Sequence, residues 1–285
     1  MATNLSPVVG FSYIGIAIFF TPFYIRLIYI FIFNKKYRSL QCYVIMIHMG
    51  IAQMLLSLNY FVCGLFHAFD SNLFGMADVL VITVVQVVKI EAVLGFILAL
   101  SRFTIIFEMK FPKQIANFLL GFAWLFFICA VALFFTPWAG YTIVKGSYMP
   151  TLNLKLPYSI LLHTIGGYVY EFIILCTLCL YVLIVIRILY VKAKNKVLKD
   201  FKKEAKVLVY AGIRFLCDSV LSVSYHYIAL PEVPETNFVL GMLYGLNNLA
   251  LPPLLYLMLY SATKKENKCG CRQKCFTCQV VSGQE

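Results

Sequence analysis

Long apolar runs dominate the chain and are separated by short polar segments. Each run is long enough to cross the hydrocarbon core of a bilayer, since about 20 helical residues rising about 1.5 Å each span about 30 Å. The runs cover residues 10–33, 42–66, 79–107, 115–137, 158–190, 206–229 and 237–260. This pattern predicts an all-α membrane protein, a bundle of seven transmembrane helices.

The basic residues of the connecting segments lie almost entirely on one side of this arrangement. Seventeen lysines and arginines follow the first, third, fifth and seventh runs, whereas the other side carries only Lys145 and Lys155. Cytoplasmic loops carry such an excess, so we expect the N-terminus outside and the C-terminus in the cytoplasm. Asn4, in an Asn-Leu-Ser sequon on the outer side, is a candidate glycosylation site.

We expect two parts in the chain: the helix bundle over residues 1–262 and a lysine- and cysteine-rich cytoplasmic tail over 263–285. The sequence shows no internal repeat and no separate soluble domain. The longest connection, Lys192 to Lys206, is too short to bury a core of its own. Function must therefore reside in the bundle and its loop ends.

Composition agrees with a multi-pass protein of the plasma membrane. Hydrophobic residues make up 62% of the chain and charged residues 13%, with a mean hydropathy of +0.86. The net charge of +12 would suggest nucleic acid as a partner of a soluble protein. Here the positive charge lies in short loops between apolar runs, so membrane lipids are the expected contacts and nucleic acid is not.

Five ionisable side chains interrupt the apolar runs. Such a residue is costly in a membrane helix, so it usually has a partner or a function. Two readings are open: structural ion pairs that fix helix packing, or residues of a ligand cavity or switch. Arg214 and Asp218 are four positions apart and can pair on one face, and Lys89 can pair with Glu171 across the bundle. The candidates are Lys89, Glu91, Glu171, Arg214 and Asp218.

No catalytic or metal-binding constellation is present in the sequence. The four histidines have no metal-ligand spacing, and the sequence has no zinc-protease, nucleophile-elbow or phosphate-loop motif. We therefore expect no enzyme activity, no cofactor and no metal. The tail cysteines lie among lysines, where palmitoylation is favoured over zinc binding, and free thiols are a third alternative. These lipidation candidates are Cys269, Cys271, Cys275 and Cys278.

Short motifs in three runs carry a family resemblance. The Ala-Leu-Ser-Arg-Phe segment at 99–103, the Pro-Leu-Leu-Tyr-Leu segment at 253–257 and the second run at 41–54 resemble the nematode serpentine chemoreceptors, of class T or the neighbouring class X. The resemblance covers roughly the first helix to Ala262. It implies a chemosensory G-protein-coupled receptor in the plasma membrane, expected in a sensory cilium, with a small-molecule ligand and a heterotrimeric G protein as partners. A receptor dimer stays open.

The resemblance also implies roles for residues at the cytoplasmic end. Arg102 would face the groove for the Gα subunit, Pro252 and Pro253 would form a hinge in the seventh helix, and Tyr256 would act as a packing switch. A basic rim would complete the coupling surface, although membrane topology alone explains most of its lysines. The rim consists of Lys110, Lys199, Lys202, Lys203 and Lys206.

The chain departs from the family pattern in several places. Ser101 stands where asparagine is usual, Pro252 precedes the helix-7 proline in place of asparagine, and Gln53 replaces an expected carboxylate. Glu91 lies three helical turns before Arg102 and is a candidate to supply that carboxylate, near Asn247 or Asn248. The rival interpretations are a seven-helix ligand-gated channel subunit, which the basic-residue distribution disfavours, and a small-solute transporter, for which matching broken helices are missing.

Overall fold

The structure is a computed structural model that describes residues 5–34, 41–70, 72, 75–109, 112–144, 146–195, 212–213, 215–224 and 233–254. Within these residues, five helices are long and apolar enough to cross a membrane. They are α1 (Ser6–Phe33), α3 (Gln41–Phe69), α4 (Met76–Ile106), α5 (Lys113–Phe134) and α6 (Ser159–Asn195). Their bounds agree with the predicted runs to within about five residues.

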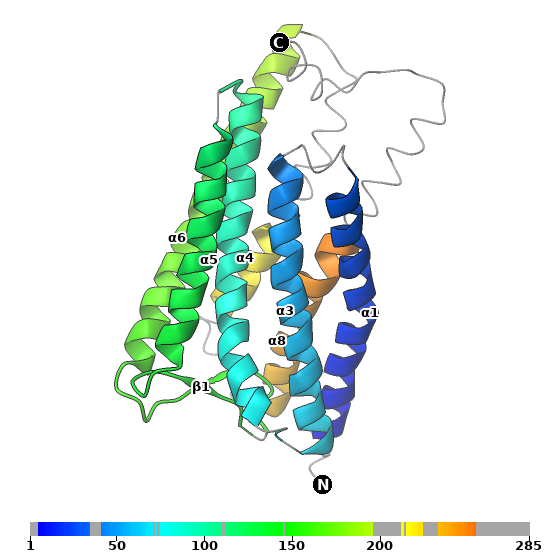
Figure 1. Cartoon of the computed structure of the whole chain (residues 1–285), viewed down its shortest axis with the longest axis vertical. Coiled ribbons are helices and arrows are strands. Elements are labelled where there is room, and N and C mark those ends of the chain that lie inside the picture. The colour runs from blue at the N-terminus through cyan, green and yellow to red at the C-terminus, as the bar shows by residue number, and fades with distance from the viewer. Residues whose placement is uncertain are drawn as a thin grey trace.

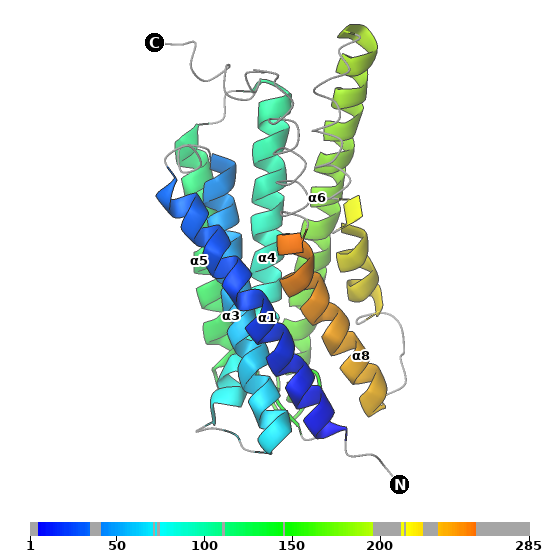
Figure 2. The ribbon, with the colours of Figure 1, turned by 90° about the vertical axis from the view of Figure 1, so that its right-hand side faces the viewer.

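Two shorter helical segments stand where the sixth and seventh runs were predicted. The first is Phe215–Ser224, and the rest of the expected 206–229 run lies outside the described residues. The second begins at Pro234 with α8 (Pro234–Gly245), continues as η2 (Leu246–Ala250) and stays helical to Leu254. The helices run along the long axis of the molecule (Figure 1), and α6 projects beyond the others at the end opposite the start of α1 (Figure 2).

Proline marks the start of several helices. Pro7 lies in the first turn of α1, Pro112 caps α5, and Pro234 opens α8. The first turn of a helix tolerates proline because its backbone N–H groups have no intrahelical acceptor. Gly75 precedes α4 with a φ of 74°, in the left-handed region that glycine adopts without strain.

Glycine lets α1 and α3 approach closely. A Cβ atom added to Gly10 would lie 2.6 Å from the carbonyl oxygen of Gly64, and one added to Gly64 would lie 2.8 Å from the carbonyl oxygen of Gly10. Backbone-to-backbone contact through small residues is a common means of packing membrane helices, since lipid gives little hydrophobic drive for their association. This crossing fixes the first two helices against each other.

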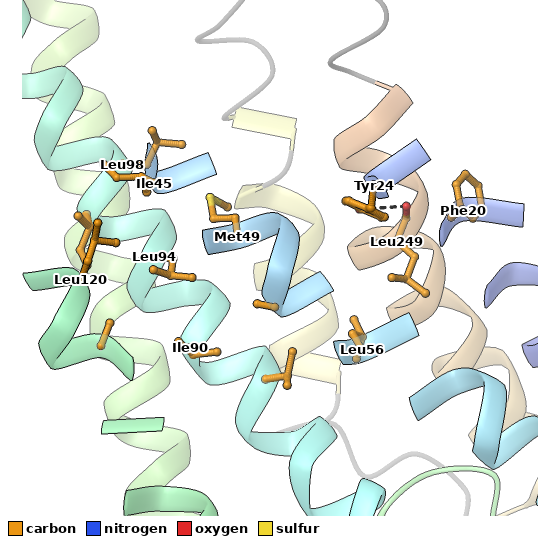
Figure 3. Close-up of a cluster of buried hydrophobic side chains, with 14 of the residues drawn as sticks. Phe20, Tyr24, Ile45, Met49, Leu56, Ile90, Leu94, Leu98, Leu120 and Leu249 are labelled. Carbon is orange, nitrogen blue, oxygen red and sulfur yellow. Dashed lines mark hydrogen bonds between the residues drawn. The ribbon is translucent and has the colours of Figure 1, made fainter. Parts of the chain in front are cut away.

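The centre of the bundle is a cluster of buried aliphatic side chains (Figure 3). Ile45 and Leu56 of α3 meet Ile90 and Leu94 of α4, and Leu249 of η2 joins them; each is at most 1% exposed. In contrast, α6 leaves many large apolar side chains uncovered, among them Phe172 and Ile186. An apolar outer surface of this kind suits contact with lipid.

The seventh helix changes its hydrogen bonding before its two prolines. Along η2 the backbone widens to a π-turn, in which the N–H of Leu251 donates to the carbonyl of Leu246. Pro252 and Pro253 lack N–H groups, so the carbonyls of Asn248 and Leu249 four positions earlier lose their usual helical donors. Tyr24 of α1 supplies a donor instead.

The Tyr24 hydroxyl lies 3.0 Å from the Asn248 carbonyl oxygen. It lies 3.1 Å from the Leu249 carbonyl oxygen, the contact drawn as a dashed line in Figure 3. Asn248 and Leu249 are 4% and 0% exposed, so their carbonyls are shielded from solvent and need a donor within the protein. The tyrosine thus compensates for both prolines and ties α1 to the seventh helix. The hinge role of Pro252 and Pro253 stays a prediction.

Candidate functional site

A short hairpin covers the end of the bundle at which α1 begins. Its strands, β1 (Tyr141–Thr142) and β2 (Thr151–Leu152), are antiparallel, and Tyr141 is paired with Leu152. The hairpin joins α5 to α6 and is drawn in green at the foot of the bundle (Figure 1). Met149 and Pro150, just before β2, form part of a cavity beneath it.

This cavity has a volume of about 120 Å³ and lies between α3, α4, α6 and the α8–η2 helix. Its apolar wall includes Leu56, Val84, Val85 and Val88. Its polar groups come from four separate elements, so the bundle rather than any one loop defines the site. They are Tyr60, Lys89, His163, Tyr170, Tyr244 and Asn248.

Lys89 provides the positive charge of the cavity. Its ammonium lies 5.7 Å from the centre of the Phe134 ring, within the range of a cation–π contact. The same nitrogen lies where a Cβ of residue 166 would stand, so the Lys89 side chain would have to move if that residue were not glycine. Among the described residues, Lys89 makes no ion pair.

The predicted pair between Lys89 and Glu171 is therefore wrong. Depth along the helix gives the reason: the Lys89 ammonium lies at Gly166, and Glu171 is five residues further along α6. Five residues correspond to about 7.5 Å of helix rise, too far for an ion pair with a nitrogen at Gly166. Glu171 is half-buried on α6, and the cavity lining does not include it.

A second, smaller chamber of about 50 Å³ adjoins the first and shares Tyr60, Val84, Met149 and Pro150 with it. Across it, the Tyr13 hydroxyl donates to the carbonyl oxygen of Tyr148 at 2.8 Å, which fastens the hairpin to α1. Burial and the negative charge of Glu235 raise the pKa of the Tyr148 phenol above its ordinary value of 10.0. The Tyr148 side chain therefore stays neutral at physiological pH.

His163 fastens the hairpin on its other side. Its Nδ1 lies 2.7 Å from the Tyr141 hydroxyl, so β1 is hydrogen-bonded to α6. The Ser159 hydroxyl also accepts a hydrogen bond from the backbone N–H of Gly140 at 3.1 Å. These contacts, with the one from Tyr13, hold the cover of the cavity to both sides of the bundle.

Glu91 lies deeper in the bundle, next to Gln53. It was predicted to supply the carboxylate that the family pattern has in place of Gln53. It is 4% exposed, and its Oε1 accepts a hydrogen bond from Gln53 Nε2 at 2.6 Å. The contact joins α3 to α4. The proximity of Glu91 to Asn247 or Asn248 stays a prediction. The Asn247 amide donates to Asp218 at 2.5 Å, which joins η2 to the helix Phe215–Ser224.

We expect Gln53→Leu to lower the free energy of unfolding by about 1–3 kcal/mol, because it leaves a buried acceptor of Glu91 without its donor. Gln86 offers a matched control. It is 1% exposed, and neither of its amide atoms has a hydrogen-bond partner among the described residues, so Gln86→Leu should be neutral or stabilising. Thermal unfolding of the purified variants measures both. Equal losses for the two substitutions would contradict the role given to the Gln53 contact.

Arg102 lies toward the opposite end of α4. It is 13 positions after Lys89, which corresponds to about 20 Å of helix. Leu98, one helical turn before Arg102, belongs to the buried cluster against which Cys42 at the start of α3 packs, so the two helix ends lie close together there. The cavity and Arg102 thus occupy the two ends of one helix.

Many of the predicted site residues lie outside the described residues. They include the partner expected for Asp218, the helix-7 switch residue, the basic rim, the sequon and the tail cysteines. These residues are Arg214, Tyr256, Lys110, Lys199, Lys202, Lys203, Lys206, Asn4, Cys269, Cys271, Cys275 and Cys278. Their roles stay predictions.

Sequence reasoning missed several residues of the cavity. His163 and the Gly166–Gly167 pair were not singled out, although adjacent glycines inside a run of bulky apolar residues indicate a close approach by another group. Met149 and Pro150 carried no signal, because their part in the cavity depends on how the hairpin folds back over the bundle.

Comparison with known proteins defines the class of fold. A scan against protein-family models gives no match, and a search of curated proteins gives none. The fold matches that of a solved structure that is a bundle of seven helices, and the chain is a multi-pass membrane protein. One similar structure is squid rhodopsin, with a TM-score of 0.71 and 13% sequence identity over 96% of this chain and 84% of the rhodopsin chain.

Proposed function

We propose that this protein is a chemosensory G-protein-coupled receptor that binds a small molecule from the extracellular side and activates a heterotrimeric G protein. One observation carries the proposal: a bundle with the rhodopsin fold encloses a cavity at the end where α1 begins. The distribution of basic residues supports placing that end outside the cell. The motifs shared with nematode serpentine chemoreceptors support the chemosensory role.

The mechanism is a shift between two packings of the bundle. A ligand in the cavity touches α3, α4, α6 and the α8–η2 helix at once, so it favours the packing in which these helices suit it best. Two contacts can transmit the change: the Asn247–Asp218 hydrogen bond to the sixth helix, and α4 itself, which ends near Arg102. Movement at that end opens a groove for the Gα subunit.

The test is nucleotide exchange on a G protein by surface-expressed receptor, challenged with volatile and water-soluble small molecules. Arg102→Ala is expected to reduce the ligand-driven exchange to the basal rate at equal surface expression. Arg26→Ala is the matched control, because Arg26 is an exposed arginine in the second half of α1, toward the same end of the bundle. It should leave exchange unchanged.

Other outcomes distinguish the rival functions. Ligand-dependent current or solute flux without nucleotide exchange would move the assignment to a channel or a transporter. If the Arg102→Ala variant still catalysed nucleotide exchange at the full rate, this arginine would have no role in coupling. The receptor assignment would then rest on the ligand-driven exchange alone.

A further inference from the structure

The cavity carries one positive charge and an apolar wall, and this combination selects a ligand class. We propose that it binds small organic monocarboxylates, with the carboxylate on the Lys89 ammonium and a single ring or short alkyl chain against the valines of α4. This inference rests on the proposed receptor function, since it names the ligand class of the same site.

The charge balance of the lining points to an anion. Lys89 is the charged residue among the described residues that line the cavity, and these include no carboxylate. An ammonium that faces a membrane-buried cavity is stabilised most by a counter-ion. The centre of the Phe134 ring lies 5.7 Å from the ammonium nitrogen on one side, but an uncharged ring does not neutralise the positive charge. A cationic ligand would meet repulsion here.

Lys89 is also the hydrogen-bond donor of the lining that is available to a ligand. The Tyr60 hydroxyl already donates to the Gly241 carbonyl at 2.9 Å, and the Asn248 amide to the Tyr244 carbonyl at 3.0 Å. His163 is hydrogen-bonded to Tyr141. The Lys89 ammonium makes no hydrogen bond within the described part of the chain, so its three protons suit an acceptor that enters the cavity.

The volume limits the size of the ligand. The cavity of about 120 Å³ is slightly smaller than the engineered apolar cavity of about 150 Å³ that holds benzene. A single ring or a short alkyl chain is therefore the size of apolar group that suits this space. Leu56, Val84, Val85 and Val88 supply the apolar wall for it.

The experiment measures binding without a G protein, on purified full-length protein in lipid nanodiscs. Phenylacetate and hexanoate are compared with phenylacetamide and hexanamide, which match them in shape but are neutral. We expect the carboxylates to bind roughly tenfold tighter or more than the amides, since a charge-assisted hydrogen bond is stronger than a neutral one. This comparison needs no variant. Amides that bind as tightly as the acids, or carboxylates that do not bind, would overturn the proposal.

Lys89→Met and Lys89→Gln should remove the preference for the carboxylates, and at least one of them must retain the unfolding temperature of the parent protein. Lys155→Met is the matched control, because Lys155 is an exposed lysine of the segment that joins β2 to α6 and does not line the cavity. It should bind as the parent does. A carboxylate preference that survives in a folded Lys89 variant would overturn the assignment.

Nucleotide exchange measured on the same samples separates the two proposals. Carboxylate binding that depends on Lys89 without exchange would support the ligand class and contradict the receptor function. Exchange driven by neutral or cationic compounds, with no carboxylate binding, would support the receptor function and contradict the ligand class.

Discussion

Gly10→Val is expected to destabilise the protein by about 1–3 kcal/mol or more and to lower sharply the fraction that reaches the cell surface. The atoms nearest to an added Cβ belong to the backbone of α3, namely the carbonyl oxygen of Gly64 and the backbone of Ala68. The helical backbone of α3 cannot turn aside at these positions as a flexible side chain can. The start of α1 and the end of α3 must therefore move apart.

Gly15→Val is the matched control for this prediction. Gly15 lies on the same helix, and an added Cβ there would meet nothing within 4 Å. Valine at this position should leave the unfolding temperature and the surface fraction close to those of the parent. If both variants lost stability alike, a general effect of valine on insertion of the first helix would explain the loss, and close packing at Gly10 would not.

Tyr24→Phe is expected to cost about 1–3 kcal/mol of unfolding free energy, although it removes a single oxygen atom. That oxygen is the donor for the carbonyls of Asn248 and Leu249. Without it, both acceptors stay buried and lose this hydrogen bond, while the ring still fills its place. Thermal or denaturant unfolding of the purified variant measures the loss.

A double-mutant cycle with the prolines tests the reason for this loss. Replacing Pro252 by alanine restores an N–H that can donate to Asn248 in the ordinary helical way, and Pro253→Ala does the same for Leu249. The cost of Tyr24→Phe should therefore be clearly smaller when both prolines are alanine. An unchanged cost would show that Tyr24 stabilises the fold through its ring packing or another contact.

The helices themselves could be predicted from the sequence because their cause is local. A run of apolar residues about 20 or more long must be helical in lipid, where every backbone hydrogen bond has to be made within the segment. The bounds of α1, α3 and α5 followed from this argument to within a few residues. The wide turn at η2 was not foreseen, although the prolines that follow it were seen to free backbone carbonyls.

The pairing of polar groups between helices could not be predicted in the same way. Partners depend on the rotation and tilt of each helix, which side-chain packing sets over the whole bundle. Lys89 and Glu171 show the difficulty: both were found as polar interruptions, yet the ammonium lies at Gly166 and on the ring of Phe134. Glu91 was predicted to supply the carboxylate that Gln53 lacks. The hydrogen bond between these two side chains, and the one between Asn247 and Asp218, were not predicted.

The π-turn in η2 has a consequence for how the chain tolerates a change of length. An α-helix turns by roughly 100° per residue, so losing one residue from a membrane helix normally rotates everything after it onto the wrong face. At Leu246–Ala250 the backbone already holds one residue more than an α-turn would. A deletion within this turn can be absorbed by its closure to an ordinary helix, which leaves the prolines in phase with Tyr24. The seventh helix can therefore lose one residue within this turn and keep the residues after it on the same face.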